Sequence, residues 1–278
     1  MKNLPVISSR DNQRLISARK IRDRHISGKI FIEGKRLAAE ALKSNLAIEE
    51  CFVSEKFANS GDNSEMLTRL CESARFTFEL PDRVFHSIAA TEHSQGVILI
   101  TERPKQSKEL IESRLSNNSA LPIVLVLYEI SNPSNLGAVL RTAEAAGIAG
   151  IVITENSTDV YSPKSLRASM GAALRLPVWT ESTLDTSIAW AKELGLETTA
   201  TSANCATSYT ELDWSRPRLL IFGSEAHGLT ETQLCGVSEQ IRIPMEVHVE
   251  SLNLAVATGI ILFEAKRQIH KSSINDSN

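Results

Sequence analysis

The chain has 278 residues, of which 42% are hydrophobic and 23% are charged, and its formal net charge is −3. These values are ordinary for a folded globular protein, and the length suits two domains that each bury a core. They exclude a uniformly basic nucleic-acid binder and a low-complexity chain.

The first 43 residues carry a charge that the average conceals. They contain eleven Lys or Arg against four Asp or Glu, a net charge of +7, so that the remainder carries −10. Such a segment suits a phosphate-rich partner, because neutralising phosphates releases counterions. The alternative is a solvated helix face without a partner. The candidates for phosphate contacts are Arg10, Arg14, Arg19, Lys20, Arg22, Arg24, Lys35 and Arg36.

Short apolar runs alternate with helical stretches between residues 29 and 102, in the order KIFIEG, KRLAAEALKS, IEECFVSE, EMLTRLCESA, FTFEL and GVILIT. This alternation predicts a small α/β domain over residues 1–105. Residues 106–121 are rich in Lys, Ser and Asn and lack a sustained apolar face, which predicts a linker.

A second core begins with PIVLVLYEI, a nearly continuous apolar run typical of a strand buried on both faces of a parallel sheet. Strand and helix patterns alternate from there to the final helical segment SLNLAVATGIILFEAKRQ. They predict an open parallel sheet with helices on both faces over residues 122–270, followed by a flexible tail at 271–278.

The cysteines and the opening residues bear on location. Cys51, Cys71, Cys205 and Cys235 include no Cys-x-x-Cys pair, which favours free thiols in a reducing compartment over a zinc site. The first residues lack the apolar core of a secretory signal, and the longest apolar stretch, 254–263, is too short to span a bilayer. We therefore expect a cytoplasmic protein.

Ligands bind at the carboxyl ends of the strands in such sheets, and three polar segments lie there. The first is SNPSNLG at 131–137, followed on the next helix by Arg141. Asn135, Gly137 and Arg141 could converge on one polar ligand. Alternatively, Asn135 caps the helix, Gly137 serves packing and Arg141 pairs with Glu144.

The second segment is GSEAHG at 223–228, directly after the strand RLLIF, where two glycines let the backbone approach a ligand closely. It matches neither a dinucleotide-binding fingerprint nor a phosphate loop, and Glu225 disfavours a bound phosphate. His227 is either a general base or a surface residue.

The third segment runs from Ile243 to Asn253 and opens the last helix. Ser251 suits a helix N-cap. Asn253 lies inside the apolar stretch 252–263, where a buried amide must find hydrogen-bond partners, so it is either a site residue or a backbone clamp.

Together these segments resemble the signature motifs of the SpoU, or TrmH-like, branch of the SPOUT methyltransferase superfamily. They read NPSNLGAVLRTAEAAG, LLIFGSEAHGL and IPMEVHVESLNLAVATGIILFEAKRQ, and YSPKSLRASMGAALRLPV is also family-like. The resemblance spans residues 122–268, and FIEGKRLAAEAL and IEECFVSE look like a ribosomal-protein-like RNA-binding domain.

The resemblance implies a C-terminal α/β domain with a deep trefoil knot, a smaller N-terminal α/β RNA-binding domain, and a homodimer formed through the knot region and the last helix. It also implies that S-adenosylmethionine binds in the knot without a metal ion. The implied cofactor-binding residues are Thr201, Ser202, Ala203, Gly223, Ser224, Gly228, Ile243, Met245, Leu252 and Asn253.

The activity that the resemblance implies is methyl transfer to a ribose 2′-hydroxyl of structured RNA. Ribosomal RNA is favoured over transfer RNA because a separate domain suits a loop recognised by shape. Arg141 would act as base or alkoxide stabiliser, and Asn135 and Glu225 would position the nucleotide or the arginine. Ser251 and Asn253 would order the knot and contact the substrate. The alternative is a catalytically silent RNA-binding or ribosome-assembly factor.

The sequence departs from the family pattern at Ala226 and Val247, where glycine is common. A side chain at either position would be strained if the loop required a positive φ.

Overall fold

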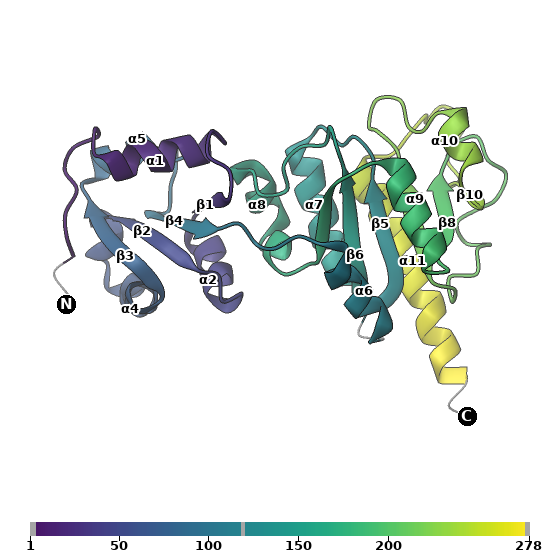
Figure 1. Ribbon diagram of the computed structural model, residues 1–278, viewed down its shortest axis with the longest axis horizontal. Coiled ribbons are helices and arrows are strands. Elements are labelled where there is room, and N and C mark those ends of the chain that lie inside the picture. The colour runs from purple at the N-terminus through teal and green to yellow at the C-terminus, as the bar shows by residue number, and fades with distance from the viewer. Residues whose placement is uncertain (1–3, 118–119, 276–278) are drawn as a thin grey trace. The chain divides into compact units, whose positions relative to one another are not determined.

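The computed structural model of the chain describes residues 4–117 and 120–275, which divide into two compact units. Unit 1 comprises residues up to Lys105 together with Val160–Arg175, and unit 2 comprises Gln106–Asp159 and Leu176 onward. Figure 1 shows the elements of both units.

Unit 1 contains a mixed sheet of four strands in the order β1-β4-β2-β3. Strand β4 is antiparallel to β1 and β2, whereas β2 and β3 are parallel. The strands are β1 (Lys29–Glu33), β2 (Ile48–Ser54), β3 (Ala74–Leu80) and β4 (Val97–Glu102). The helices of its first segment are α1 (Gln13–Arg22), α2 (Lys35–Lys43), α3 (Glu55–Ala58), α4 (Ser64–Ser73) and α5 (Asp82–Ile88), with a 3-10 turn at Gly61–Asn63.

Alternating side chains of these strands face two helical layers. Phe31, Phe52 and Ile98 pack with the apolar faces of α1 and α5. Their chain neighbours therefore point to the opposite face, where α2 and α4 pack (Figure 1). The predicted β/α alternation is thus the observed order of elements.

Residues 160–175 belong to unit 1 although they lie between two strands of unit 2. They form α8 (Pro163–Ser169) and a 3-10 turn (Ala172–Leu174), and α8 packs on β1. Arg175 forms an ion pair with Glu40, and the Arg103 guanidinium lies 4.8 Å from the centre of the Tyr161 ring. The sequence pattern placed this segment in the second domain.

Unit 2 contains a sheet of six parallel strands in the order β10-β8-β9-β5-β6-β7. The strands are β5 (Leu121–Leu127), β6 (Ile148–Thr154), β7 (Val178–Ser182), β8 (Glu197–Thr201), β9 (Arg218–Phe222) and β10 (Glu239–Ile241). The helices are α6 (Lys108–Ser116), α7 (Pro133–Ala146), α9 (Leu184–Glu193), α10 (Glu231–Cys235) and α11 (Leu254–Asn275). The open parallel sheet predicted from the sequence is confirmed.

Helices cover both faces of this sheet. Val124 and Val126 of β5 pack in one cluster with Leu184 and Ile188 of α9. The alternate residues of β5 face the other side, and α7, which contacts β6, packs against α11 (Figure 1). All of β5 from Ile123 onward is buried, as a strand between two helical layers requires.

The segment expected to be a linker contains helix α6. Ile111 of this helix is fully buried, and a Cβ on Gly150 of β6 would lie 2.7 Å from its side chain. The helix packs this closely because the strand has no side chain at Gly150. At the other end of the unit, α11 continues to Asn275 where a flexible tail was expected from 271, and residues 276–278 lie outside the described residues.

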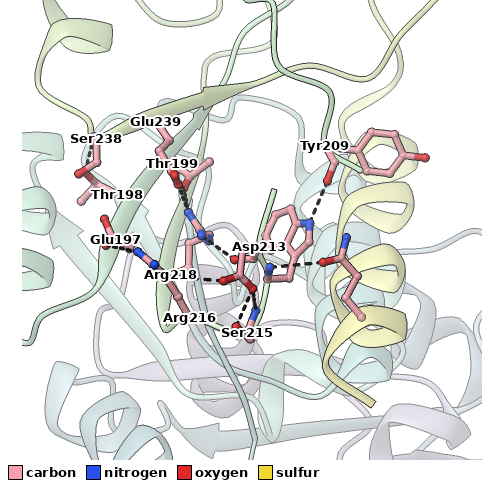
Figure 2. A network of polar contacts seen from close by, with 12 residues as sticks. Glu197, Thr198, Thr199, Tyr209, Asp213, Ser215, Arg216, Arg218, Ser238 and Glu239 are labelled. Carbon is pink, nitrogen blue, oxygen red and sulfur yellow. Dashed lines mark hydrogen bonds and ion pairs between the residues drawn. The ribbon is translucent and has the colours of Figure 1, made fainter. Parts of the chain in front are cut away.

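A buried arginine joins three strands of unit 2 (Figure 2). Arg218 of β9 is 1% exposed, forms an ion pair with Glu239 of β10, and donates a 2.6 Å hydrogen bond to Thr199 of β8. It also donates to the carbonyl of Asp213 at 2.9 Å and lies over the buried Trp214 ring. This network fixes the loop before β9 and the short strand β10 to the sheet.

Candidate functional site

The three polar segments meet at the carboxyl ends of β8, β9 and β10, where they line a pocket of about 700 Å³. Asn135 of α7 and the residues that precede α11 complete the lining. All ten residues that the resemblance implied for the cofactor line it: Thr201, Ser202, Ala203, Gly223, Ser224, Gly228, Ile243, Met245, Leu252 and Asn253. The structure therefore brings together residues that span fifty-three positions of the sequence, from 201 to 253.

The loop 223–228 is closed on itself by its own backbone. Ser224 and Gly228 exchange two main-chain hydrogen bonds of 3.1 and 2.9 Å. Gly228 has a φ of +64°, and a Cβ on Gly223 would lie 2.4 Å from the carbonyl carbon of Gly228. A side chain at Gly223 would force this loop apart, so the glycines set the shape of the pocket wall.

Glu225 ties this loop to the start of α7. Its carboxylate accepts hydrogen bonds from the Ser131 hydroxyl and the Asn132 amide, both at 3.1 Å, and from the side-chain amide of Asn135. Asn135 in turn accepts a 3.1 Å hydrogen bond from the Asn253 side chain. The sequence pattern did not single out Ser131 or Asn132 for this contact, since no spacing rule links them to a residue 94 and 93 positions away.

Asn253 caps the last helix. Its side-chain oxygen accepts a 3.0 Å hydrogen bond from the Ala255 amide, while its amide nitrogen donates to Asn135. The residue is exposed rather than buried among apolar neighbours, so the expectation of a buried amide was wrong. Ser251 lines the pocket, and the cap predicted for it is formed by Asn253 instead.

Arg141 does not line the pocket. It lies on α7 with an exposed side chain, and across residues 4–117 and 120–275 no hydrogen bond or ion pair engages it. Two of the three local alternatives for this segment are wrong, because Asn132 rather than Asn135 caps α7 and no ion pair joins Arg141 to Glu144 among the described residues. Gly137 is buried on α7, as the packing alternative expects. Arg141 therefore presents a free guanidinium from the second half of the helix that begins beside Asn135.

The two positions that depart from the family pattern carry no backbone strain. Six non-glycine residues of the described chain have a positive φ, and neither Ala226 nor Val247 is among them. Val247 is 92% exposed, and His227 is exposed and contacts Ser224 only through its backbone amide.

The basic residues of the N-terminal segment fall into two groups. Arg10, Arg19 and Arg22 donate to backbone carbonyls, and Arg14 pairs with Glu50, so these four contribute to the structure of unit 1. Lys35 lies 5.5 Å from the centre of the Phe57 ring. Three exposed cations have no partner within the part of the chain that the structure describes: Lys20, Arg24 and Arg36.

The described residues contain no cluster of three His, Cys, Asp or Glu side chains arranged to hold a metal ion. No described helix is long and apolar enough to cross a membrane.

Two protein-family models match most of the chain. The model of the SpoU rRNA methylase family matches residues 122–263, and that of the MRM3-like substrate-binding domain matches residues 13–99. An uncharacterized tRNA/rRNA methyltransferase of Synechocystis is 33% identical over 246 residues, 87% of this chain and 85% of that protein. The 23S rRNA (guanosine(2553)-2′-O)-methyltransferase RlmP of Bacillus subtilis is 26% identical over 94% of this chain and 98% of its own length.

A solved structure is similar over nearly the whole chain. The AdoMet-bound rRNA methyltransferase of Sinorhizobium meliloti superposes with a TM-score of 0.82 at 27% identity, covering 96% of this chain and 98% of that one. Family models and full-length relatives thus agree with the motifs that line the pocket. The chain belongs to the SpoU rRNA methylase family.

Proposed function

We propose that the chain is an S-adenosylmethionine-dependent methyltransferase that modifies a ribose 2′-hydroxyl in structured RNA, with ribosomal RNA favoured as substrate. The observation that carries the proposal is the pocket at the ends of β8, β9 and β10, which gathers every residue implied for the cofactor. The Bacillus subtilis relative acts on a 23S rRNA 2′-hydroxyl, and the Sinorhizobium meliloti structure holds AdoMet.

The pocket suits S-adenosylmethionine in size and chemistry. About 700 Å³ lies within the usual range for small-molecule sites. Ile243, Met245 and Leu252 offer an apolar wall, and the closely folded 223–228 loop offers backbone groups. When bound, the cofactor supplies an activated methyl group for transfer to oxygen.

Arg141 is the residue proposed to meet the 2′-oxygen. An arginine guanidinium normally keeps its proton, so its role is to orient the hydroxyl and stabilise the negative charge that develops on the oxygen. Asn135 and Glu225 position the start of the same helix through the hydrogen bonds described above. Asn253 and Ser251 order the segment before α11.

A homodimer belongs to this proposal. Arg141 does not line the pocket of its own chain, which favours a second copy as the source of the guanidinium that meets a bound methyl donor. Helix α11 offers an apolar surface for that contact, since Val256 and Phe263 are 51% and 49% exposed. The trefoil knot in the C-terminal segments and the cytoplasmic location are part of the same proposal.

Unit 1 is proposed to hold the RNA through the cations that its own structure leaves free. Replacing Lys20, Arg24 or Arg36 with Gln should each reduce the salt dependence of RNA binding by about one charge. Lys43→Gln is the matched control, because Lys43 is already paired with Glu40. If the variants at Lys20, Arg24 and Arg36 keep the salt dependence of the unaltered chain, the basic segment is a solvated surface.

Two measurements on the full chain test the proposed activity. Calorimetry measures binding of S-adenosylmethionine, and a tritium assay measures methyl transfer to unmodified ribosomal RNA, with unmodified transfer RNA in parallel. We expect Arg141→Ala to abolish transfer while cofactor affinity stays within about tenfold, or ~1.4 kcal/mol. Full activity of that variant would remove Arg141 from the mechanism.

The alternatives give different results in the same assays. Transfer to transfer RNA alone identifies the other substrate class. Cofactor binding without transfer to either RNA by the unaltered protein supports the silent ribosome-assembly factor.

A further inference from the structure

An exposed aromatic side chain stands on the edge strand of unit 1. Phe76 of β3 is 39% exposed, although its ring stacks on Phe78, with centres 6.3 Å apart and planes 25° apart. Phe78 stacks in turn on Phe52, which is fully buried, at 5.9 Å and 24°. The outermost ring is therefore held in a fixed orientation by a row of aromatic side chains that begins in the core.

Two guanidinium groups flank this ring. The guanidinium carbon of Arg14 lies 4.7 Å from the centre of Phe76 and 4.9 Å from that of Phe78, and that of Arg75 lies 5.3 Å from Phe76. Arg14 is also paired with Glu50. Arg75 is exposed, and its guanidinium makes no hydrogen bond or ion pair with any residue that the structure describes, so its charge is available to an external anion.

A groove of about 420 Å³ runs beside the ring along the edge of β3. It is lined by Leu4, Pro5, Cys71, Ala74, Arg75, Phe76, Thr77 and Phe78. Part of the strand edge is already used, because Ile7 and Pro5 exchange hydrogen bonds of 3.0 and 3.1 Å with Glu79. The remaining edge is too short for an added peptide strand, which disfavours a protein partner bound by strand addition.

We propose that Arg14, Arg75, Phe76 and Phe78, here called the Phe76 face, bind one unpaired base of the RNA substrate. The base would take the place of the Arg75 guanidinium over the Phe76 ring, and Arg75 would turn to contact a neighbouring phosphate, while Arg14 stays paired with Glu50. Exposed aromatic rings with adjacent arginines are the usual means by which proteins hold single-stranded RNA, because every base has a π-face. The inference rests on the proposed function, since it assigns part of the substrate to unit 1.

The test uses the full chain and a fluorescein-labelled oligouridine strand, with a fully paired RNA duplex as the second probe. We expect Phe76→Ala to weaken oligouridine binding about tenfold, the equivalent of ~1.4 kcal/mol, and to leave duplex binding unchanged. Phe76→Trp should restore the affinity, because the indole ring also stacks on bases. Leu110→Ala, at an exposed apolar residue of unit 2 that is 44% exposed, is the matched control and should bind as the unaltered chain does.

Arg75→Gln separates charge from stacking, because it should reduce the salt dependence of oligouridine binding by about one charge. The proposal is overturned if Phe76→Ala binds oligouridine as tightly as the unaltered chain, which would leave the face to a protein partner. It is also overturned if strand and duplex affinity fall together, because a stacked base is absent from the duplex probe.

The methyl-transfer assay on the unaltered chain is scored separately. If the unaltered chain transfers no methyl group while Phe76→Ala still weakens oligouridine binding, the proposed enzymatic activity is refuted and the base-binding face is supported. If the unaltered chain transfers the methyl group and Phe76→Ala keeps both methyl transfer and oligouridine binding, only the base-binding face is refuted.

Discussion

Glu225 is expected to control cofactor affinity through the shape of the loop on which it lies. Its carboxylate accepts three hydrogen bonds from residues 131–135 and so fastens the 223–228 loop to the start of α7. The hydrogen bonds from Ser131 and Asn132 share one carboxylate oxygen, and the one from Asn135 goes to the other. In Glu225→Gln the remaining oxygen keeps the first two, while the new NH2 group faces the NH2 group of Asn135, so that one hydrogen bond is lost.

The magnitude follows from the exposure of this side chain. A hydrogen bond to a charged group contributes about 1.5–3 kcal/mol when buried, and exposure reduces this to about 1 kcal/mol each. A loss of about 1 kcal/mol in the binding-competent loop shape raises the dissociation constant of S-adenosylmethionine by up to roughly fivefold. Calorimetry on the purified variant measures this dissociation constant.

Glu250→Gln is the matched control, because Glu250 lines the same pocket and is exposed, and no hydrogen bond or ion pair within the described chain involves its carboxylate. It removes the same charge without loosening the loop, so we expect a change of about twofold at most. Equal effects of the two variants would refute the argument, since the pocket would then respond to charge alone.

Two further predictions concern stability. Glu239→Ala leaves the Arg218 guanidinium buried among neutral partners and should cost about 2–3 kcal/mol in urea unfolding, discounted because Glu239 is 41% exposed. Glu197→Ala, which removes an exposed pair at 3.7 Å, should cost less than about 1 kcal/mol, and a similar loss for both would contradict the buried network. Burial raises the pKa of the Cys51 thiol in the folded protein. The unfolded thiol therefore ionises first as the pH rises, above about pH 8.5. The free energy of unfolding is unaffected by this group below that pH and falls above it. A thiol reagent should label exposed Cys235 in the native protein and Cys51 only after unfolding, and the fall in stability between pH 7.5 and 9.5 should shrink in Cys51→Ala.

The order of strands and helices could be predicted because each element carries its own local pattern. The run at 122–127 is apolar without interruption because both faces of β5 are covered, and PSNLGAVLRTAEAA becomes a helix that Asn132 caps and Gly147 ends. The residues of the pocket were identified by resemblance, since their meeting at one sheet edge depends on strands far apart in the chain.

Contacts that depend on tertiary packing could not be predicted. Helix α6 has no sustained apolar face, and one buried side chain, Ile111, holds it against Gly150. Asn253 lies inside an apolar stretch in the sequence but sits at an exposed helix start. Likewise, charge counting treats all basic residues of the N-terminal segment alike, whereas packing commits Arg22 to carbonyls and leaves Arg24 free.

The discontinuous make-up of unit 1 restricts how the chain can be built and dissected. Unit 1 consists of residues up to 105 and the segment 160–175, in which Leu166 and Ala172 are buried. A truncation that removes residues 1–105 would therefore expose the apolar side chains of segment 160–175. During synthesis unit 1 cannot complete its packing until residue 175 has left the ribosome, by which time β5 and β6 of unit 2 have already been made. Exchange of the substrate-binding unit between relatives would therefore require two grafted segments rather than one.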